Sequence, residues 1–134
     1  MKGHARNIMT APVVSVGPEA SLEEIARCLA AARIGGVPVV SAEGHVEGFV
    51  SESDLLDALL AERDTATRAS HLMTRSVHTV NEFDRTEEVM SLLRQHRIHH
   101  LPVMRSGQLV GMITPSDVIR FMVEQVLDKP PEIS

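Results

Sequence analysis

The chain contains the stretch Gly48-Phe49-Val50-Ser51-Glu52-Ser53-Asp54, which returns as Gly111-Met112-Ile113-Thr114-Pro115-Ser116-Asp117. A similar segment precedes each copy, Ile34-Gly35-Gly36-Val37-Pro38-Val39 in the first case and Ile98-His99-His100-Leu101-Pro102-Val103 in the second. The repeat distance of roughly 64 residues is too long for a solenoid unit and suits two small subdomains. The duplication therefore predicts two related ligand sites rather than one catalytic centre.

Short lead-in segments extend the repeat toward the N-terminus, because Ile8-Met9-Thr10 matches Leu72-Met73-Thr74. We assign repeat 1 to residues 8–62 and repeat 2 to residues 72–127, and we expect them to form one domain together. The tail, residues 128–134, is expected to be disordered, because chain ends are poorly ordered unless something ties them down.

The composition is typical of a globular protein with an aliphatic core. The chain has 134 residues, of which 43% are hydrophobic and 23% charged, and its only aromatic residues are three Phe. A chain of this length buries roughly two-thirds of its unfolded surface. A net charge of -5 and the lack of Trp and Tyr disfavour nucleic-acid binding, which relies on basic surfaces and aromatic stacking.

Cysteine content and hydropathy bear on the cellular compartment. Cys28 has no partner for an intramolecular disulfide, which fits a reducing environment. No apolar run approaches the roughly 20 residues of a membrane-spanning helix, and the N-terminus lacks a signal-type apolar core. We therefore expect a cytoplasmic protein without a membrane partner.

The residue pattern of each repeat predicts the order β-α-β-β-α. In repeat 1 we expect a strand at 12–16, a helix between the Ser21–Glu24 capping box and Gly35-Gly36, a hairpin of 37–40 with 46–50, and a helix at 52–62. Four leucines of that last helix are expected to face inward: Leu55, Leu56, Leu59 and Leu60. Repeat 2 follows the same order, with a hairpin turn at 105–107 and a last helix at 115–127.

Two such repeats predict an α/β (α+β) domain. A three-stranded sheet with helices on one face leaves its other face uncovered, so we expect the two sheets to pack on each other about a pseudo-twofold axis. That packing would bury Val39, Phe49, Val103 and Ile113. The first helix of repeat 2 is expected to carry Val89, Leu92, Leu93 and His96 on one face.

The ordered pair of Pro-Val strands, Gly-x-x-[Ser/Thr]-x-x-Asp segments and Met-Thr lead-ins resembles a tandem pair of cystathionine-β-synthase (CBS) domains, also called a Bateman module. The resemblance covers about residues 8–127. It implies a regulatory module that binds AMP, ADP, ATP or S-adenosylmethionine and forms a homodimer. Most such pairs sit beside an enzyme, channel or transporter domain. This chain resembles a stand-alone pair, for which a separate enzyme or transporter would be the regulated partner.

The resemblance also implies two clefts, each built from both repeats. Cleft A would contain Ser51, Asp54, Val77, His78, Thr79, Arg97, His99, His100 and Leu101. Cleft B would contain Val14, Ser15, Val16, Arg33, Gly35, Val37, Thr114 and Asp117. In each cleft the aspartate would bind the ribose diol, since an ionised carboxylate accepts both hydroxyl protons.

Asp54 and Asp117 also have a purely structural interpretation. Both stand in the first turn of a predicted helix, where an acidic residue closes a capping box and favours the helix dipole. The two roles are compatible, because a helix N-terminus also attracts phosphate.

His99 and His100 give the two clefts unequal chemistry. The family often has basic phosphate-contacting residues at this place, whereas repeat 1 has Gly35 and Gly36 there. We therefore expect cleft A to prefer a phosphorylated ligand. A solvated histidine pair is the alternative interpretation.

Other constellations are weaker. A metal site at His96, His99 and His100 is disfavoured, because the helix should stop near Arg97 and break the i,i+4 geometry. Arg33 and Arg97 recur at one repeat position, either as phosphate contacts or as solvated charges at helix ends. No nucleophile–base arrangement can be assembled, so we predict that the chain is not an enzyme. An interaction module with degenerate clefts, indifferent to ligand, is the alternative function.

Overall fold

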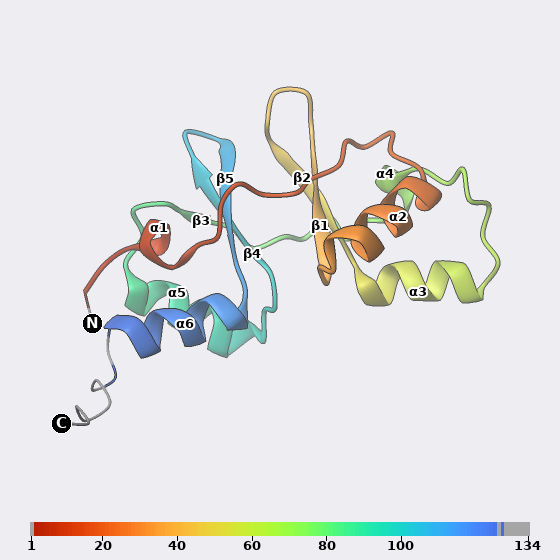
Figure 1. Ribbon diagram of the computed structural model, residues 1–134. Helices are drawn as coiled ribbons and strands as arrows, with labels where there is room; N and C mark the ends of the chain where they lie inside the picture. Colours follow the sequence, from red (N-terminus) through yellow and green to blue (C-terminus); the bar gives the residue numbers. More distant parts are fainter. Residues whose placement is uncertain (1, 126, 128–134) are drawn as a thin grey trace. The chain divides into compact units, whose positions relative to one another are not determined.

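The computed structural model describes residues 2–125 and residue 127 (Figure 1). They form two compact units, and each unit draws on both sequence repeats. Unit 1 comprises Met1–Val13, Thr79–Arg105 and Val110–Ser134, as far as these segments are described, and unit 2 comprises Val14–His78 and Ser106–Leu109. The tail for which we predicted disorder, residues 128–134, lies outside the described residues.

Unit 2 consists of a hairpin and the helices that pack on it. Its elements are α2 (Leu22–Ala32), β1 (Gly36–Val40), β2 (Val46–Ser51), α3 (Glu52–Leu60) and α4 (Ala69–Leu72). The two strands are antiparallel, with Gly36 opposite Ser51. The strand predicted at residues 12–16 is wrong, because only Val16 pairs, through an isolated parallel bridge to Val39. Pro12 has no N–H to contribute to a strand ladder.

Unit 1 has the fuller sheet. Its elements are α1 (Ala5–Ile8), β3 (Val80–Asn81), α5 (Thr86–His96), β4 (Leu101–Arg105), most of β5 (Gln108–Ile113) and α6 (Pro115–Gln125). The strand order is β3-β4-β5, and Val80 of β3 lies parallel to Val103 of β4. The turn at Ser106 and Gly107 has positive φ at both residues, 48° and 78°, which is typical of a type I′ hairpin.

The predicted α/β class is confirmed, with two small sheets and their helices. Val39, Val103 and Ile113 are fully buried, each in the core of its own unit, and Phe49 is half-buried. Packing of the two sheets on each other stays a prediction. No helix in the described part of the chain is long and apolar enough to span a bilayer.

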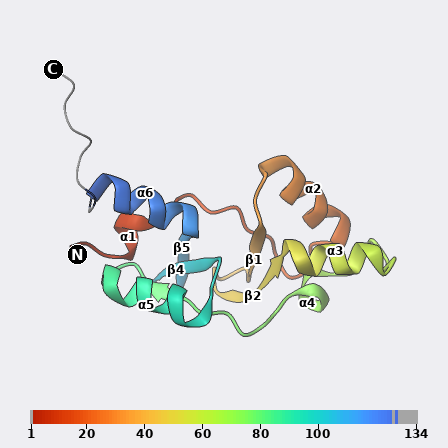
Figure 2. The same ribbon diagram turned by 90° about the horizontal axis from the view of Figure 1, so that it is seen from below.

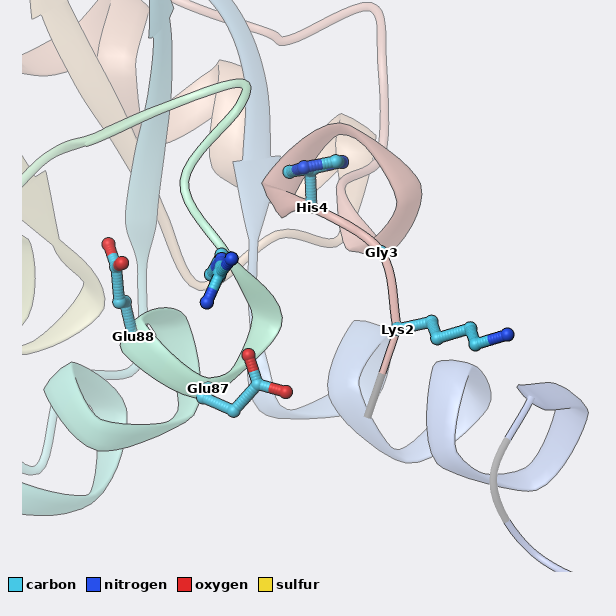
Figure 3. A pocket seen from close by; sticks show the side chains of 6 residues that line it. Lys2, Gly3, His4, Glu87 and Glu88 are labelled. Atoms are coloured by element: carbon cyan, nitrogen blue, oxygen red, sulfur yellow. The ribbon is translucent and has the colours of Figure 1, made fainter.

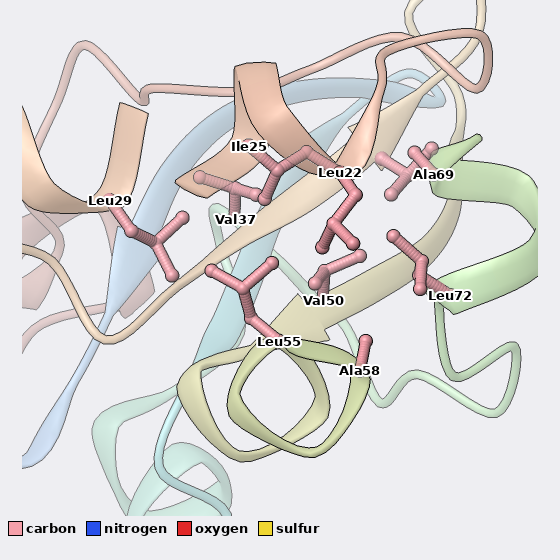
Figure 4. Close-up of a cluster of buried hydrophobic side chains, with 10 residues drawn as sticks. Leu22, Ile25, Leu29, Val37, Val50, Leu55, Ala58, Ala69 and Leu72 are labelled. Atoms are coloured by element: carbon pink, nitrogen blue, oxygen red, sulfur yellow. The ribbon is translucent and has the colours of Figure 1, made fainter. Parts of the chain in front are cut away.

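The two hydrophobic cores use equivalent repeat positions. Figure 4 shows the core of unit 2, which contains Leu22, Ile25, Leu29, Val37, Val39, Val50, Leu55, Ala58, Ala69 and Leu72. The core of unit 1 contains Ala5, Ile8, Val80, Val89, Leu101, Val103, Ile113 and Phe121. One equivalent pair breaks the pattern, because Thr86 replaces Leu22 and its buried hydroxyl has no hydrogen-bond partner among the described residues.

Each lead-in segment docks on the other repeat. Thr10 exchanges backbone hydrogen bonds of 2.9 and 3.0 Å with Met112 in β5, and Thr74 exchanges two of 2.9 Å with Phe49 in β2. The short helix before each of these threonines packs in the same unit. Helix α1 contacts α5 and α6 (Figure 2), and α4 contacts α2 and α3. The repeats are therefore joined by exchange of their first segments.

Arginines, not glycines, end the first helix of each repeat. We predicted that Gly35-Gly36 would end α2, but Arg33 is its C-cap in the left-handed conformation, with φ 55°. Arg97 follows α5 in the same way, with φ 49°. Each arginine donates its backbone N–H to a helix carbonyl, that of Leu29 or of Leu93. Both side chains are exposed.

Three of the four leucines predicted on the inward face of α3 are exposed, so the prediction is wrong for them. Leu55 is buried together with Ala58, but the exposed fractions of Leu56, Leu59 and Leu60 are 55%, 45% and 74%. Residues three apart share one face of a helix, so the stripe of Leu55 and Ala58 meets the core and the other leucines turn away. His96 of α5, expected on one face with Val89, Leu92 and Leu93, is exposed, whereas Val89 is buried and the two leucines are half-buried. The structure describes α6 to Gln125.

Helix capping provides a first test. Ser21 caps α2, with its Oγ accepting from the Glu24 N–H at 3.1 Å, whereas the equivalent Arg85 makes no side-chain cap of α5. Ser21→Ala is expected to lower the free energy of unfolding by about 1 kcal/mol, and Arg85→Ser to raise it by a similar amount. Chemical denaturation measures both. An Arg85→Ser protein no more stable than the parent would contradict this account of α5.

The glycines of the repeated motif provide a second test. A Cβ at Gly48 would lie 2.5 Å from Met73 Sδ and 2.8 Å from the Thr74 carbonyl oxygen, and a Cβ at Gly111 would collide with Met9. Gly48→Ala is expected to lower the free energy of unfolding by about 1–3 kcal/mol, because the docked lead-in must shift. The control is Gly17→Ala, whose Cβ would meet only Glu19 Oε2, at 3.7 Å. Equal stability of the two variants would argue against close docking of the lead-in.

Candidate functional site

The motif aspartate of repeat 2, Asp117, lies in the first turn of α6 and is 4% exposed. Its Oδ2 accepts from the Thr114 N–H at 2.8 Å and from the Thr114 hydroxyl at 3.0 Å. Its Oδ1 accepts from Arg120 Nη2 at 2.8 Å and from the Thr10 hydroxyl. The carboxylate therefore has donors on both oxygens.

Thr10 and Arg120 connect this carboxylate to the N-terminal segment. The backbone pair with Met112 places Thr10 beside the start of α6. Arg120 stands three residues after Asp117, on the same face of the helix, and also donates to the Ile8 carbonyl at 3.4 Å. The assembly therefore fixes both α6 and the lead-in.

The surroundings of Asp117 determine its charge state. Burial raises the pKa of the carboxyl, but the hydrogen bonds from Thr10, the Thr114 backbone, Arg120 and the Thr114 hydroxyl outweigh it. The net effect is a pKa below the ordinary value for aspartate. Asp117 is therefore ionised at neutral pH despite its burial.

The motif aspartate of repeat 1, Asp54, has much simpler surroundings. Its Oδ2 accepts from the Ser51 N–H at 3.1 Å, and its own N–H donates to Ser51 Oγ at 3.1 Å, which completes a capping box at the start of α3. Thr74 holds the backbone position of Thr10 but sends no hydroxyl to Asp54, and Asp57 stands where repeat 2 has Arg120. Among the described residues, Ser51 is the only donor to the half-buried Asp54 carboxylate.

Packing restricts one of the two repeat 1 positions that correspond to the histidine pair. Gly36 lies so near Phe49 that a Cβ there would be 2.5 Å from the ring and 2.8 Å from the Val50 carbonyl oxygen. Repeat 2 has Met112 in place of Phe49 and His100 in place of Gly36. Position 36 therefore excludes a larger side chain, whereas its counterpart His100 is half-buried and His99 is exposed.

The other predicted site residues fall into both units. Unit 2 contains Val14, Ser15, Val16, Arg33, Gly35, Val37, Ser51, Asp54, Val77 and His78, and unit 1 contains Thr79, Arg97, His99, His100, Leu101, Thr114 and Asp117. Val37 and Leu101 are core residues, whereas Val14, Ser15, His78 and Thr79 are exposed. Each predicted cleft draws on both units, so the grouping into clefts A and B stays a prediction.

Two ion pairs were not predicted from the sequence. Glu82 is buried and accepts two hydrogen bonds of 2.7 Å from Arg105, which lower the pKa of its carboxyl. The Asp117–Arg120 ion pair was not predicted either, although a spacing of three residues in a predicted helix favours such a pair. Glu82 and Arg105 are 23 residues apart and give no such local signal.

Neither a surface hollow nor a metal cluster adds to this site. A hollow of about 530 Å³ is lined by Lys2, Gly3, His4, Arg85, Glu87 and Glu88. Figure 3 shows how these residues lie. Its lining mixes acidic and basic side chains and includes none of the predicted site residues. Within the described residues, no three His, Cys, Asp or Glu side chains are grouped to hold a metal ion. As predicted, α5 ends at His96, before His99 and His100.

Known proteins are similar to this chain in sequence and in fold. Hypoxic response protein 1 of Mycobacterium tuberculosis is 28% identical over 126 residues, which are 92% of this chain and 87% of that protein. The structure of CBSX2 in complex with AMP has a TM-score of 0.81 at 25% identity, covering 92% of this chain and 98% of that one. The CBS domain pair of protein MJ0100, in complex with 5′-methylthioadenosine and S-adenosyl-L-methionine, has a TM-score of 0.78 at 25% identity, covering 89% and 94%.

The CBS domain model matches the chain twice, over residues 5–61 and 69–124. Both matches include a lead-in, a Pro-Val strand and an aspartate motif, the features that the two units display in three dimensions. The chain therefore belongs to the CBS domain family and carries two copies of that domain.

Proposed function

We propose that the protein is a regulatory sensor of adenine nucleotides or a related adenosine compound, and that Asp54 binds the ribose. The observation that carries the proposal is the state of Asp54, a half-buried carboxylate at a helix N-terminus with one donor among the described residues. Such a carboxylate has lone pairs left for two sugar hydroxyls. Similar structures in complex with AMP and with S-adenosyl-L-methionine support an adenosine ligand.

Phosphate recognition is assigned to the start of α3 and to the histidine pair of the other repeat. Helix N-termini attract anions through their free N–H groups and the helix dipole. His99 and His100 provide donors that Gly35 and Gly36 lack. A phosphorylated ligand therefore favours cleft A, which would contain Ser51, Asp54 and both histidines. Ligand binding there would regulate a partner only if the two conformations of the protein differ in affinity for it.

Isothermal titration of ligand-free protein with AMP, ADP, ATP and S-adenosylmethionine tests the proposal. We expect at least one of them to bind, and Asp54→Ala to weaken AMP binding about 10- to 100-fold, because hydrogen bonds to a charged group are lost. His99→Ala should weaken it less, and Asp117→Ala less than Asp54→Ala.

The matched control is Asp57→Ala, which removes an exposed carboxylate from the same helix. It should leave the affinity for AMP unchanged. Failure of all four ligands at millimolar concentration would contradict the sensor function. A protein partner whose binding is indifferent to Asp54→Ala and Asp117→Ala would then favour the interaction module.

A homodimer is the second part of the proposal. Leu56 and Leu60 lie on the exposed face of α3, and the equivalent Ile119 and Val123 are 64% and 58% exposed on α6. Residues four apart share a helix face, so each repeat presents one apolar stripe to solvent. Apolar side chains repeated at matching positions are typical of an interface, and we propose that a second copy covers them.

Light scattering after gel filtration measures the oligomeric state. We expect the parent protein to be a dimer, and the double variant Leu60→Glu, Val123→Glu to be a monomer, because each charge would be buried unpaired at the interface. Glu124→Gln, at an exposed position of α6, is the control and should remain dimeric. A monomeric parent protein would rule out this interface.

A further inference from the structure

The two motif aspartates are equivalent in sequence but differ in the lone pairs they have left. An ionised carboxylate offers about four acceptor positions. Four donors already engage Asp117, two on each oxygen, and the side chain is 6% exposed. Asp54 accepts from Ser51 alone among the described residues.

A sugar diol that approached Asp117 would have to displace one of those donors. The Arg120 hydrogen bond is charge-assisted, at 2.8 Å, and belongs to the stronger class of protein hydrogen bonds. Loss of such a bond corresponds to about a 10- to 100-fold weaker affinity. The backbone pair with Met112 keeps Thr10 beside Asp117, so a ligand could displace its hydroxyl only through a change of side-chain rotamer.

We propose that Thr10 and Arg120 act as a built-in substitute for a ligand on Asp117, so that each chain binds one adenosine-type ligand, at Asp54. This inference rests on the proposed function and specifies its stoichiometry. Arg120 is a positioning residue that acts through Asp117, and Asp57 is its counterpart that leaves Asp54 open. In repeat 2 the motif anchors the N-terminal segment, and in repeat 1 it receives the ligand.

A graft of the blocking residue onto repeat 1 gives the sharpest test. Asp57→Arg places a guanidinium three residues after Asp54, with the spacing of Arg120 and Asp117. We expect it to weaken AMP binding about 10- to 100-fold, although a positive charge by itself would attract the phosphate. Asp57→Ala should bind AMP like the parent. Equal or tighter binding by Asp57→Arg would overturn the inference.

The stoichiometry of AMP binding, measured by calorimetry, provides the second arm. The parent protein should bind one equivalent per chain, and Arg120→Gln should bind a second, weaker one. Two equivalents on the parent protein, or a second equivalent that fails to appear on a folded Arg120→Gln protein, would contradict the inference. If the parent protein binds none of the four ligands, the proposed function itself fails. Asp57 is exposed, so the first arm decides the question even if Arg120→Gln does not fold.

Discussion

Two pairs of backbone hydrogen bonds tie the lead-ins into the fold, one between Thr10 and Met112 in unit 1 and one between Thr74 and Phe49 in unit 2. Each ties a lead-in to the strand that runs into an aspartate-bearing helix, and each requires a glycine at the point of closest approach, Gly48 or Gly111. The repeated Gly-x-x-[Ser/Thr]-x-x-Asp motif therefore has a structural role in docking the lead-in. Its glycine admits the lead-in, and its aspartate begins the helix beside it.

The two repeats have the same backbone arrangement, but the donors to their motif aspartates differ. Arg120 and Thr10 engage Asp117, whereas Asp57 and Thr74 leave the Asp54 carboxylate to Ser51. A second difference lies at position 36, where a Cβ would meet the Phe49 ring and the Val50 carbonyl oxygen, whereas repeat 2 has His100 there. The two repeats therefore share these backbone contacts and differ in the side chains around the motif aspartates.

Sequence patterns predicted the parts of the fold that depend on contacts between residues close in sequence. Residues close in sequence determine three features that were predicted: the Ser21–Glu24 capping box, the hairpin of β1 and β2, and the end of α5 before His99. The docking of each lead-in on the other repeat has no such signal, because Thr10 and Met112 are far apart along the chain.

The errors have different physical origins, one local and the others in tertiary packing. Gly35-Gly36 suggested a helix end that Arg33 provides instead, and the four leucines of α3 did not reveal which stripe meets the core. For the candidate site, the sequence predicts roles for the two aspartates and the histidine pair. It did not show that Asp117 is already engaged, because one of its donors comes from the lead-in.

A crystal structure of the protein grown with AMP would test the central claim most directly. We expect ribose hydroxyls on the Asp54 carboxylate, with the Asp117–Arg120 pair and the Thr10 contact intact. Ribose on Asp117, with Arg120 displaced, would contradict it.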